Sequence, residues 1–314
     1  MVGQAIKRNL LKNGYGNKEN GGSLLTPTRE KLNLTNYDDV KNWFEINRPT
    51  VVVLAAAKVG GILANSSEPT EFILENLKIQ TNVIENAWKF GVKRLLFLGS
   101  SCIYPKYANQ PIEEVSLLTN SLEETNQYYA IAKIAGIKLC EALRKQYNFD
   151  AISLMPTNLY GPGDNYHDSN SHVMASLIKK FYFASRDNHP SLTCWGTGSP
   201  LREFMHVDDL GDAVVFALEN WFPGAKGAPL DEKGNPLYLL NVGTGKDISI
   251  KDLAIKISKI TCFKGEIIWD SSKPNGTPKK QLNVEKLREM GWEPNIQLEE
   301  GIRKTLVSFK EENL

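Results

Sequence analysis

The sequence has few of the residues that build metal centres or disulfide frameworks, and it has no long apolar run. Its 314 residues include only four cysteines, which are widely scattered, and four histidines. No Cys-x-x-Cys pair or Cys/His cluster occurs, so no metal site is expected, and free thiols in a reducing cytoplasm are the expected state. No stretch approaches the roughly 18 apolar residues of a membrane span. The first residues lack the apolar segment of a signal peptide. We therefore expect a cytoplasmic protein with no membrane partner.

An excess of charge of one sign is also missing. The chain carries 37 basic and 36 acidic residues, for a formal net charge of +1. No basic stripe interleaved with aromatic residues appears, so a nucleic-acid partner has no support. With 41% hydrophobic and 23% charged residues, the composition is that of an ordinary globular protein. A chain of this length can bury one main domain together with a smaller second lobe.

What is present is a regular alternation of helix-like and strand-like segments. Val2, Ile6 and Leu10 share one helix face, and Gly14 provides a helix stop. Segments at 50–61, 92–105 and 150–163, each with an apolar run, alternate with helical segments at 67–91 and 126–147. Strands that are apolar on both faces and alternate with helices predict an α/β fold with a parallel, doubly wound Rossmann sheet.

The second half of the chain has a different pattern. Beyond residue 163, polar loops separate shorter elements, which predicts a smaller mixed α/β lobe on the substrate side of a cleft. We expect residues 1–163 to form the dinucleotide-binding domain and residues 164–314 to form mainly the substrate-binding lobe. The segment 238–262 is expected to return to the main sheet, and Pro278 and Lys279 are expected in a surface loop.

The most specific chemical signal is Tyr129 with Lys133. Their i, i+4 spacing places both side chains on one helix face, where a cation beside a phenol is expected to lower the pKa of the tyrosine. Such a tyrosine can exchange a proton with an oxygen atom while hydride moves at the adjacent carbon. A Tyr-x-x-x-Lys pair alone is common by chance. Here it follows a strand-end turn in which Ser100 or Ser101 would hydrogen-bond the same oxygen.

Four segments together resemble a known family: GSSCIYP (99–105), YYAIAK (128–133), PTNLYGPG (156–163) and REFMHVDD (202–209). They resemble the extended short-chain dehydrogenase/reductases, especially the GDP-4-keto-6-deoxymannose 3,5-epimerase-4-reductases, over essentially the whole chain. The resemblance implies conversion of GDP-4-keto-6-deoxy-D-mannose to GDP-L-fucose with NADP(H) as cofactor. It also implies a homodimer formed through the helices at 69–88 and 128–145.

The resemblance also assigns roles to particular residues. Tyr129, Lys133 and Ser100 would serve the reduction, and Cys102 and His172 would be the acid/base pair of the epimerisation. A thiol and an imidazole both titrate near neutrality, which suits that task. Taken alone, Cys102 could be a small buried apolar residue and His172 a solvated loop residue. His167 and His189 lie in polar segments, and His206 is expected to serve structure. The implied cofactor contacts are Gly3, Arg29, Leu98, Gly99, Ser100, Ser101, Lys133, Pro156, Thr157, Asn158, Leu159 and His172.

Substrate binding is expected mainly in the second lobe. Arg202 offers a planar fork for phosphate oxygens, Lys180 a second cation and Trp195 a flat face for a base or sugar. Without the resemblance, each would be a solvated charge or a core aromatic. Asn275 stands where relatives often have aspartate, and an amide there can still accept a hydrogen bond from a sugar hydroxyl.

The sequence leaves two alternatives for the type of cofactor and two explanations for the missing first strand. Arg29 fits the 2′-phosphate of NADP, whereas the adjacent Glu30 would fit the ribose hydroxyls of NAD. Of the family's first strand and glycine-rich turn, only Gly3 is present. Without that strand we expect a gap in the sheet, poor folding and weak binding of NADP. A start assigned too far downstream and a truncated gene are the two explanations.

Two other functions compete with this prediction. Another nucleotide-sugar epimerase or dehydratase of the same superfamily is one, although a dehydratase would carry an acidic residue where Cys102 stands. The other is an inactive module that binds a nucleotide sugar or NADP(H).

Overall fold

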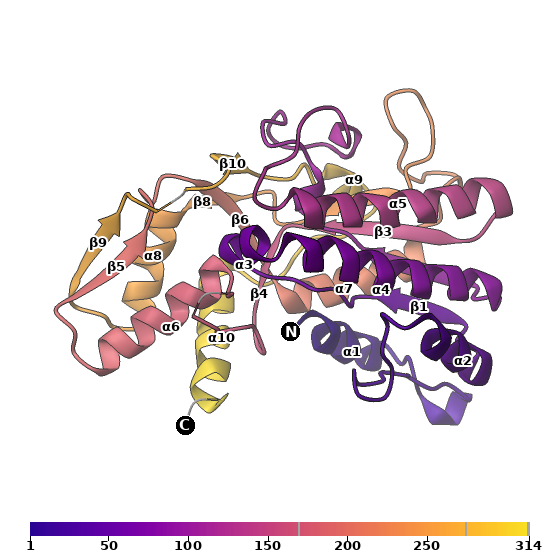
Figure 1. Cartoon of the computed structure of the whole chain (residues 1–314), viewed down its shortest axis with the longest axis horizontal. Helices are drawn as coiled ribbons and strands as arrows, with labels where there is room; N and C mark the ends of the chain where they lie inside the picture. Colours follow the sequence, from indigo (N-terminus) through magenta and orange to yellow (C-terminus); the bar gives the residue numbers. More distant parts are fainter. Residues whose placement is uncertain (169, 274, 313–314) are drawn as a thin grey trace.

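The chain folds into two lobes in the computed structural model, which describes residues 1–168, 170–273 and 275–312 (Figure 1). The larger lobe is built on a four-stranded parallel sheet in the order β1-β2-β3-β7. Its strands are β1 (Val51–Leu54), β2 (Arg94–Leu98), β3 (Ala151–Pro156) and β7 (Leu239–Val242). The strand order and directions confirm the predicted parallel α/β sheet.

Both faces of this sheet are covered by helices. Every residue of β2 is buried, and its side chains alternate between two cores. Leu95 and Phe97 pack with α4 (Pro69–Lys89) and α5 (Gln127–Tyr147). Leu96 and Leu98 pack with α1 (Val2–Lys12) and α7 (Val207–Asn220) on the opposite face. Because each strand residue finds an apolar layer on either side, the sheet is doubly wound, as predicted.

The helices of each layer pack closely. On one face, α1 crosses α7 where Gly211 meets Ala5, and a Cβ atom on Gly211 would lie 2.7 Å from the Ala5 carbonyl oxygen. Asn9 fixes the crossing by donating to the Ala5 and Asp208 carbonyl oxygens at 3.0 and 3.2 Å. On the other face, α4 packs along α5, and α2 (Tyr37–Asn47) packs against α4. Pro69 occupies the first turn of α4, as its sequence position predicts.

β1 is an edge strand of this sheet. β1 pairs with β2, and Val51 at its start is 40% exposed. The predicted gap inside the sheet is not found, because β1, β2, β3 and β7 pair in one continuous order. Residues 22–28, which precede Arg29, form no strand in the described structure. A strand needs a neighbour to pair its backbone N–H and C=O groups. Without such a ladder, this segment stays irregular on the larger lobe.

The second lobe contains two small sheets. One has the order β10-β6-β4, with β8 also paired to β6, and the other joins β5 to β9. Its core gathers apolar side chains from β4, β6 and the helices α6, α8 and α10. The strands are β4 (Asn158–Tyr160), β5 (Ser191–Trp195), β6 (Leu201–His206), β8 (Asp247–Ser249), β9 (Glu266–Asp270) and β10 (Lys279–Lys280). The helices are α6 (Val173–Arg186), α8 (Ile250–Ile260) and α10 (Leu298–Glu312). The short helix α9 (Glu285–Glu289) packs instead against β7 in the core of the larger lobe.

Two segments of the second half bear on the sequence predictions. β7 lies beside β3 in the main sheet, whereas β8 and α8, from the same predicted returning segment, pack in the second lobe. Lys279 lies in β10 rather than in a surface loop, because this strand pairs with β6. Among the described residues, no helix combines the length and apolar character that crossing a membrane requires.

The remaining elements are short. They are α3 (Ile62–Ser67), between β1 and α4, and the 3-10 turns η1 (Lys18–Asn20), η2 (Ser101–Ile103) and η3 (Glu114–Ser116). The turn η2 follows the carboxyl end of β2, and α3 follows the loop after β1. Both therefore lie at the edge of the sheet where parallel α/β folds bind their ligands.

Candidate active site

Ser100 and Tyr129 meet at the carboxyl end of β2. Ser100 caps the short turn η2, and its hydroxyl accepts a hydrogen bond from the Cys102 amide at 3.3 Å. The same hydroxyl is hydrogen-bonded to Tyr129, which α5 carries in its first turn. Burial raises the pKa of Tyr129, the nearby Cys102 adds to this rise, and the Ser100 contact opposes it. The phenol is therefore protonated at neutral pH, the form that can donate a proton to an oxygen.

The predicted lowering of the Tyr129 pKa by Lys133 is wrong for this structure. The Lys133 ammonium is buried and donates to the Leu98 carbonyl oxygen at 2.8 Å. It also lies 4.7 Å from the Phe97 ring centroid and 5.9 Å from that of Tyr129. Burial lowers the pKa of Lys133 to about 7. A lysine with so low a pKa, hydrogen-bonded to a backbone carbonyl, provides less positive charge to stabilise a phenolate.

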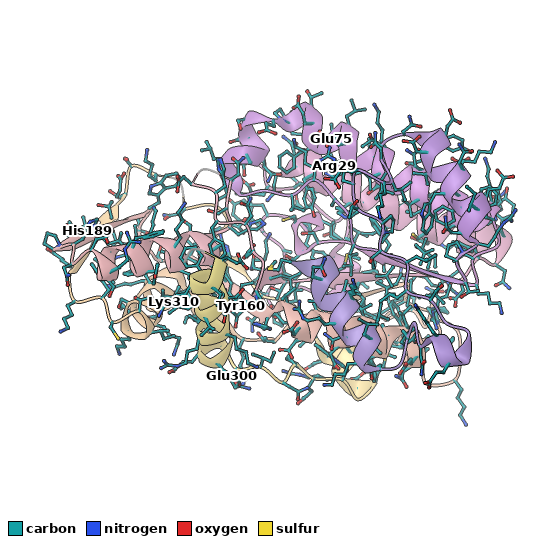
Figure 2. All side chains as sticks on the ribbon, turned by 90° about the horizontal axis from the view of Figure 1, so that it is seen from below. Arg29, Glu75, Tyr160, His189, Glu300 and Lys310 are labelled. Carbon is teal, nitrogen blue, oxygen red and sulfur yellow. The ribbon has the colours of Figure 1, made fainter. Side chains whose placement is uncertain are left out.

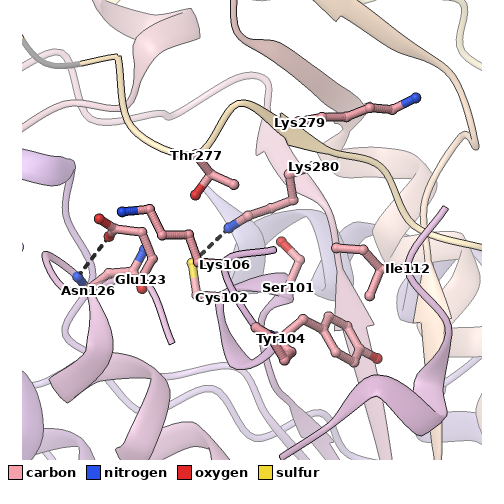
Figure 3. Close-up of a pocket in the computed structure, with 11 residues that line it drawn as sticks. Ser101, Cys102, Tyr104, Lys106, Ile112, Glu123, Asn126, Thr277, Lys279 and Lys280 are labelled. Atoms are coloured by element: carbon pink, nitrogen blue, oxygen red, sulfur yellow. Dashed lines mark hydrogen bonds between the residues drawn. The ribbon is translucent and has the colours of Figure 1, made fainter. Parts of the chain in front are cut away.

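Cys102 lies between the reducing pair and the second lobe. Lys280 of β10 donates a hydrogen bond to the Cys102 sulfur, with 3.6 Å between Nζ and Sγ (Figure 3). The Arg202 guanidinium also interacts with Cys102. Burial lowers the pKa of Arg202, and the interactions with Cys102 and Glu123 partly oppose this shift. Arg202 and Lys280 are register partners in the β6–β10 pair. One lobe thus supplies the sulfur, and the other supplies two cations that face it.

His172 lies at the start of the first helix of the second lobe. It precedes α6 as the N-cap residue, and the backbone before it packs on the loop that follows β1, where the Gly61 amide donates to the Asn170 carbonyl at 3.1 Å. The imidazole keeps an exposed side, yet the protein around it is dense enough to lower its pKa. The lowered pKa favours a neutral ring at pH 7.

The residues predicted for substrate binding form a second group. Trp195 ends β5 and is 51% exposed. The Lys180 ammonium lies 5.4 Å from the Trp195 ring centroid, and that of Lys273 lies 5.5 Å from it. The Asn275 side-chain oxygen accepts hydrogen bonds from the Thr197 amide at 2.9 Å and from its hydroxyl at 3.2 Å. This oxygen therefore braces the turn after Trp195, a role that the sequence did not predict.

This turn is close to Arg202. A Cβ atom on Gly276, the residue after Asn275, would lie 3.3 Å from the Arg202 guanidinium and 3.3 Å from Ile62 of the larger lobe. The loop with Asn275 and the strand with Arg202 therefore approach each other next to α3.

The residues predicted to contact the cofactor line the carboxyl ends of β2 and β3. Leu98 ends β2, and Gly99 to Ser101 follow it. Gly99 has no room for a side chain because Met155 of β3 lies against it. Pro156 ends β3, and Asn158 and Leu159 belong to β4. The Thr157 hydroxyl and the Asn158 amide both donate to the Glu203 carbonyl oxygen, at 3.2 and 2.8 Å. Pro156 to Leu159 thus join the two lobes.

Two predicted cofactor residues lie elsewhere on the larger lobe. Gly3 is in the first turn of α1, where a Cβ atom would meet no described atom within 4 Å. Arg29 lies in an exposed turn (Figure 2). An open helix N-terminus and an exposed guanidinium both suit the phosphates of a dinucleotide. The donor set therefore fits the predicted cofactor.

Sequence reasoning missed three residues of the site. Lys280 was not singled out because a lysine at the end of a polar loop resembles any solvated charge. Lys273 was missed for the same reason. Glu203 is completely buried and accepts hydrogen bonds from the amides of Gly245 and Leu282, at 2.9 and 2.8 Å. A carboxylate next to the predicted Arg202 in an apolar strand was the available signal for it.

The other histidines behave as expected. His206 is buried, and its Nδ1 atom accepts the Asp208 amide at 3.2 Å as the N-cap of α7. His189 is exposed and lies at the far end of the second lobe (Figure 2).

A doubly wound parallel sheet with a serine, tyrosine and lysine at one strand end defines a dinucleotide-dependent oxidoreductase of the short-chain dehydrogenase/reductase type. Comparison with known proteins agrees with this class. Residues 1–229 match the model of the NAD dependent epimerase/dehydratase family, and the chain belongs to that family.

Two relatives and one solved structure describe the similarity. The chain is 51% identical over 306 residues to probable GDP-L-fucose synthase 1 of Oryza sativa subsp. japonica, covering 97% of this chain and 88% of that protein. It is 47% identical over 311 residues to GDP-L-fucose synthase of Escherichia coli (strain K12), covering 99% and 94%. A GDP-mannoheptose C4 reductase from Campylobacter jejuni with NADP bound is 33% identical, with a TM-score of 0.85 over 98% of this chain and 95% of that one.

Proposed function

We propose that this protein converts GDP-4-keto-6-deoxy-D-mannose to GDP-L-fucose by 3,5-epimerisation followed by NADPH-dependent reduction of the 4-keto group. One observation carries the proposal: the Cys102 thiol and the hydrogen-bonded Ser100–Tyr129 pair are adjacent at the end of β2. An acid/base group and a reducing group can therefore act on one bound sugar. Relatives that are 46 to 51% identical are named as GDP-L-fucose synthases, which supports the same activity.

In the proposed epimerisation, Cys102 and His172 move protons at the carbons beside the ketone. The 4-keto group acidifies the C–H bonds at C3 and C5. One of the two side chains removes a proton from one face of the sugar ring, and the other returns a proton to the opposite face. Lys280 donates a hydrogen bond to the Cys102 sulfur, and Arg202 adds a second positive charge near it.

In the proposed reduction, Tyr129 protonates the ketone oxygen, and Ser100 donates a hydrogen bond to it. Bound NADPH supplies the hydride to C4. The raised pKa of Tyr129 keeps its proton available at neutral pH. Lys133 orients the strand end by its hydrogen bond to the Leu98 carbonyl, and it remains a candidate contact to the cofactor ribose.

The GDP part of the substrate is proposed to bind the second lobe. Arg202 and Lys180 supply positive charge for the diphosphate, Trp195 supplies an exposed aromatic face, and Asn275 lies beside the turn that follows Trp195. Residues 1–163 would then hold the dinucleotide, with Gly3 and Arg29 near its phosphates, and residues 164–314 would hold mainly the sugar nucleotide.

We also propose that the protein works in the cytoplasm as a homodimer formed by α4 and α5. These helices carry exposed apolar side chains on their outer faces, with Leu74 46%, Tyr128 40% and Ile131 42% exposed. Two copies paired as a four-helix bundle would cover these side chains.

The test is to incubate the purified protein with GDP-4-keto-6-deoxymannose and NADPH. We expect the NADPH absorbance to decrease and GDP-L-fucose to form, and we expect Tyr129→Phe to abolish both. If the folded wild-type protein neither oxidises NADPH nor forms GDP-L-fucose, it is a binding module, and the proposed activity is wrong.

A reductase without epimerisation is the second candidate, because the chain is similar to a GDP-mannoheptose C4 reductase over nearly its full length. Such an enzyme would oxidise NADPH but leave the configuration at C3 and C5 unchanged. The stereochemistry of the isolated product therefore distinguishes the two functions.

A further inference from the structure

Gly61 lies unusually close to the backbone that precedes His172. Its amide donates a hydrogen bond to the Asn170 carbonyl oxygen at 3.1 Å. A Cβ atom on Gly61 would lie 2.6 Å from the Ser171 carbonyl oxygen and 3.5 Å from its carbonyl carbon. The torsions of Gly61, φ −69° and ψ −177°, are open to any residue. Lack of space, rather than backbone conformation, therefore excludes a side chain at this position.

The loop with Gly61 is fixed from its own side. The buried Asn65 amide donates to the carbonyl oxygens of Gly60 and Gly61 at 2.8 and 3.0 Å. Further back, Asn76 of α4 bonds to both backbone groups of Lys58, at 2.9 and 3.0 Å. Because the loop is held at both ends, it resists moving away from residues 170–171.

The opposite side is fixed beyond His172. Met174 and Ala175, in the first turn of α6, are buried in the second-lobe core. The His172 carbonyl oxygen accepts the Ser176 amide at 3.0 Å. A displacement of Ser171 is therefore taken up before α6, in the segment that includes His172.

We infer that Gly61 is a positioning residue that sets the place of His172 in the proposed active site. It carries no reacting group. Its missing side chain lets the two backbones touch, and that contact fixes the distance between His172 on one lobe and Cys102 on the other. The inference rests on the proposed function, because it concerns the proton transfer assigned to His172. A displacement of about 1 Å at such a position is enough to slow a reaction about 100-fold.

The neighbouring Gly60 provides a matched control. A Cβ atom there would lie 2.9 Å from the Ala64 side chain and 3.1 Å from the Phe72 ring, but 3.9 Å from the Asn170 oxygen, an ordinary contact distance. Gly60→Ala therefore adds the same methyl group to the same loop, but its close contacts are with Ala64 and Phe72 rather than with the backbone before His172. The Phe72 ring packs edge-on against Tyr129 with 6.3 Å between centroids, so this control is expected to affect reduction rather than epimerisation.

The experiment measures two rates in each variant. One is deuterium exchange from D2O into GDP-4-keto-6-deoxymannose, and the other is NADPH oxidation with a keto sugar that has already been epimerised. For Gly61→Ala we expect the ratio of exchange to reduction to fall about 10-fold or more. For Gly60→Ala we expect no fall in this ratio. Asn65→Ala, which frees the loop without adding atoms, is expected to lower the ratio by a smaller factor.

A double-mutant comparison separates positioning from general damage. If Gly61 acts through His172, the exchange rate of Gly61→Ala combined with His172→Gln equals that of His172→Gln alone. A multiplied loss in the double variant, or an unchanged ratio in Gly61→Ala, overturns the inference.

A structural readout keeps the inference separate from the proposed function. The NMR signal of the His172 imidazole, assigned by its loss in His172→Gln, is expected to shift in Gly61→Ala and to stay in place in Gly60→Ala. An inactive wild type with the expected NMR shifts contradicts the function but supports the placement. An active wild type with an unmoved signal in Gly61→Ala contradicts the placement alone.

Discussion

The Lys280 ammonium donates a hydrogen bond to the sulfur of Cys102 at 3.6 Å, from a position 178 residues further along the chain. β10 brings it there by pairing with β6, which places Lys280 opposite Arg202. The contact crosses from the second lobe to the turn after β2 (Figure 3). A fixed positive charge beside the sulfur is suited to stabilise negative charge that develops there during proton transfer.

Replacement of Lys280 by methionine is therefore expected to slow the epimerisation. We predict a loss of about 10- to 100-fold in deuterium exchange into the keto sugar, with partial recovery in Lys280→Arg. The control is Lys279→Met, since the Lys279 ammonium instead pairs with Asp247 at 3.2 Å. Equal exchange rates in Lys280→Met and Lys279→Met would show that the cation beside Cys102 has no part in the step.

Lys133 makes stability depend on pH in the alkaline range. Burial lowers its pKa from 10.5 to about 7 in the folded protein. Between these values the unfolded chain binds more protons than the folded one, so the free energy of unfolding rises with pH. The contribution of this group reaches about 1.4 kcal/mol per pH unit. Urea unfolding of Lys133→Met between pH 7 and 9 is expected to lack this rise.

The same experiment has an internal control on the same helix. Lys138 pairs with Glu141 at the surface of α5, and Lys138→Met is expected to keep the wild-type slope. If the free energy of unfolding changes with pH equally in the wild type and in Lys133→Met, Lys133 is not a buried, weakly basic group.

Glu203 holds together the strands that carry both cations near Cys102. Its carboxylate accepts hydrogen bonds from the backbone amides of Gly245, in the turn after β7, and of Leu282, after β10. In Glu203→Gln one of these amides faces an NH2 group. We expect the free energy of unfolding to fall by about 2 to 4 kcal/mol and the KM for the GDP-sugar to rise. Thr244→Val removes only a hydroxyl near the same carboxylate and is expected to cost less than about 1 kcal/mol. Similar losses in the two variants would argue against an anchoring role for Glu203.

The proposed dimer predicts a change of mass on substitution at its apolar face. Leu74→Asp in α4 and Ile131→Asp in α5 place a charge where two copies would pack. Sedimentation of the wild type should give twice the mass of the chain, and either variant should give the mass of one chain. As a control, Ile46→Asp alters an 80% exposed residue of α2 and should leave the mass unchanged. A monomeric wild type would contradict the proposed assembly.

Much of this fold follows from local patterns in the sequence. The all-apolar segment that became β2 and the i, i+4 pair of α5 predicted a parallel sheet and a Tyr129–Lys133 face. The direction of the Lys133 side chain was not predictable, because it depends on the Leu98 carbonyl and on burial. The contact between Lys280 and Cys102 was not predictable either. It depends on the pairing of β10 with β6, and the register of strands far apart in the chain leaves no local sequence pattern. The role of Gly61 depends on a backbone approach that sequence spacing does not encode.

In the proposed mechanism, one site performs two separable reactions on one sugar. The most direct measurement follows deuterium incorporation at C3 and C5 together with NADPH oxidation, in D2O, for the wild type, Cys102→Ser and Tyr129→Phe. We predict both reactions in the wild type, reduction of a pre-epimerised keto sugar without exchange in Cys102→Ser, and exchange without NADPH oxidation in Tyr129→Phe. Wild-type NADPH oxidation without any deuterium incorporation, or full exchange in Cys102→Ser, would contradict the claim.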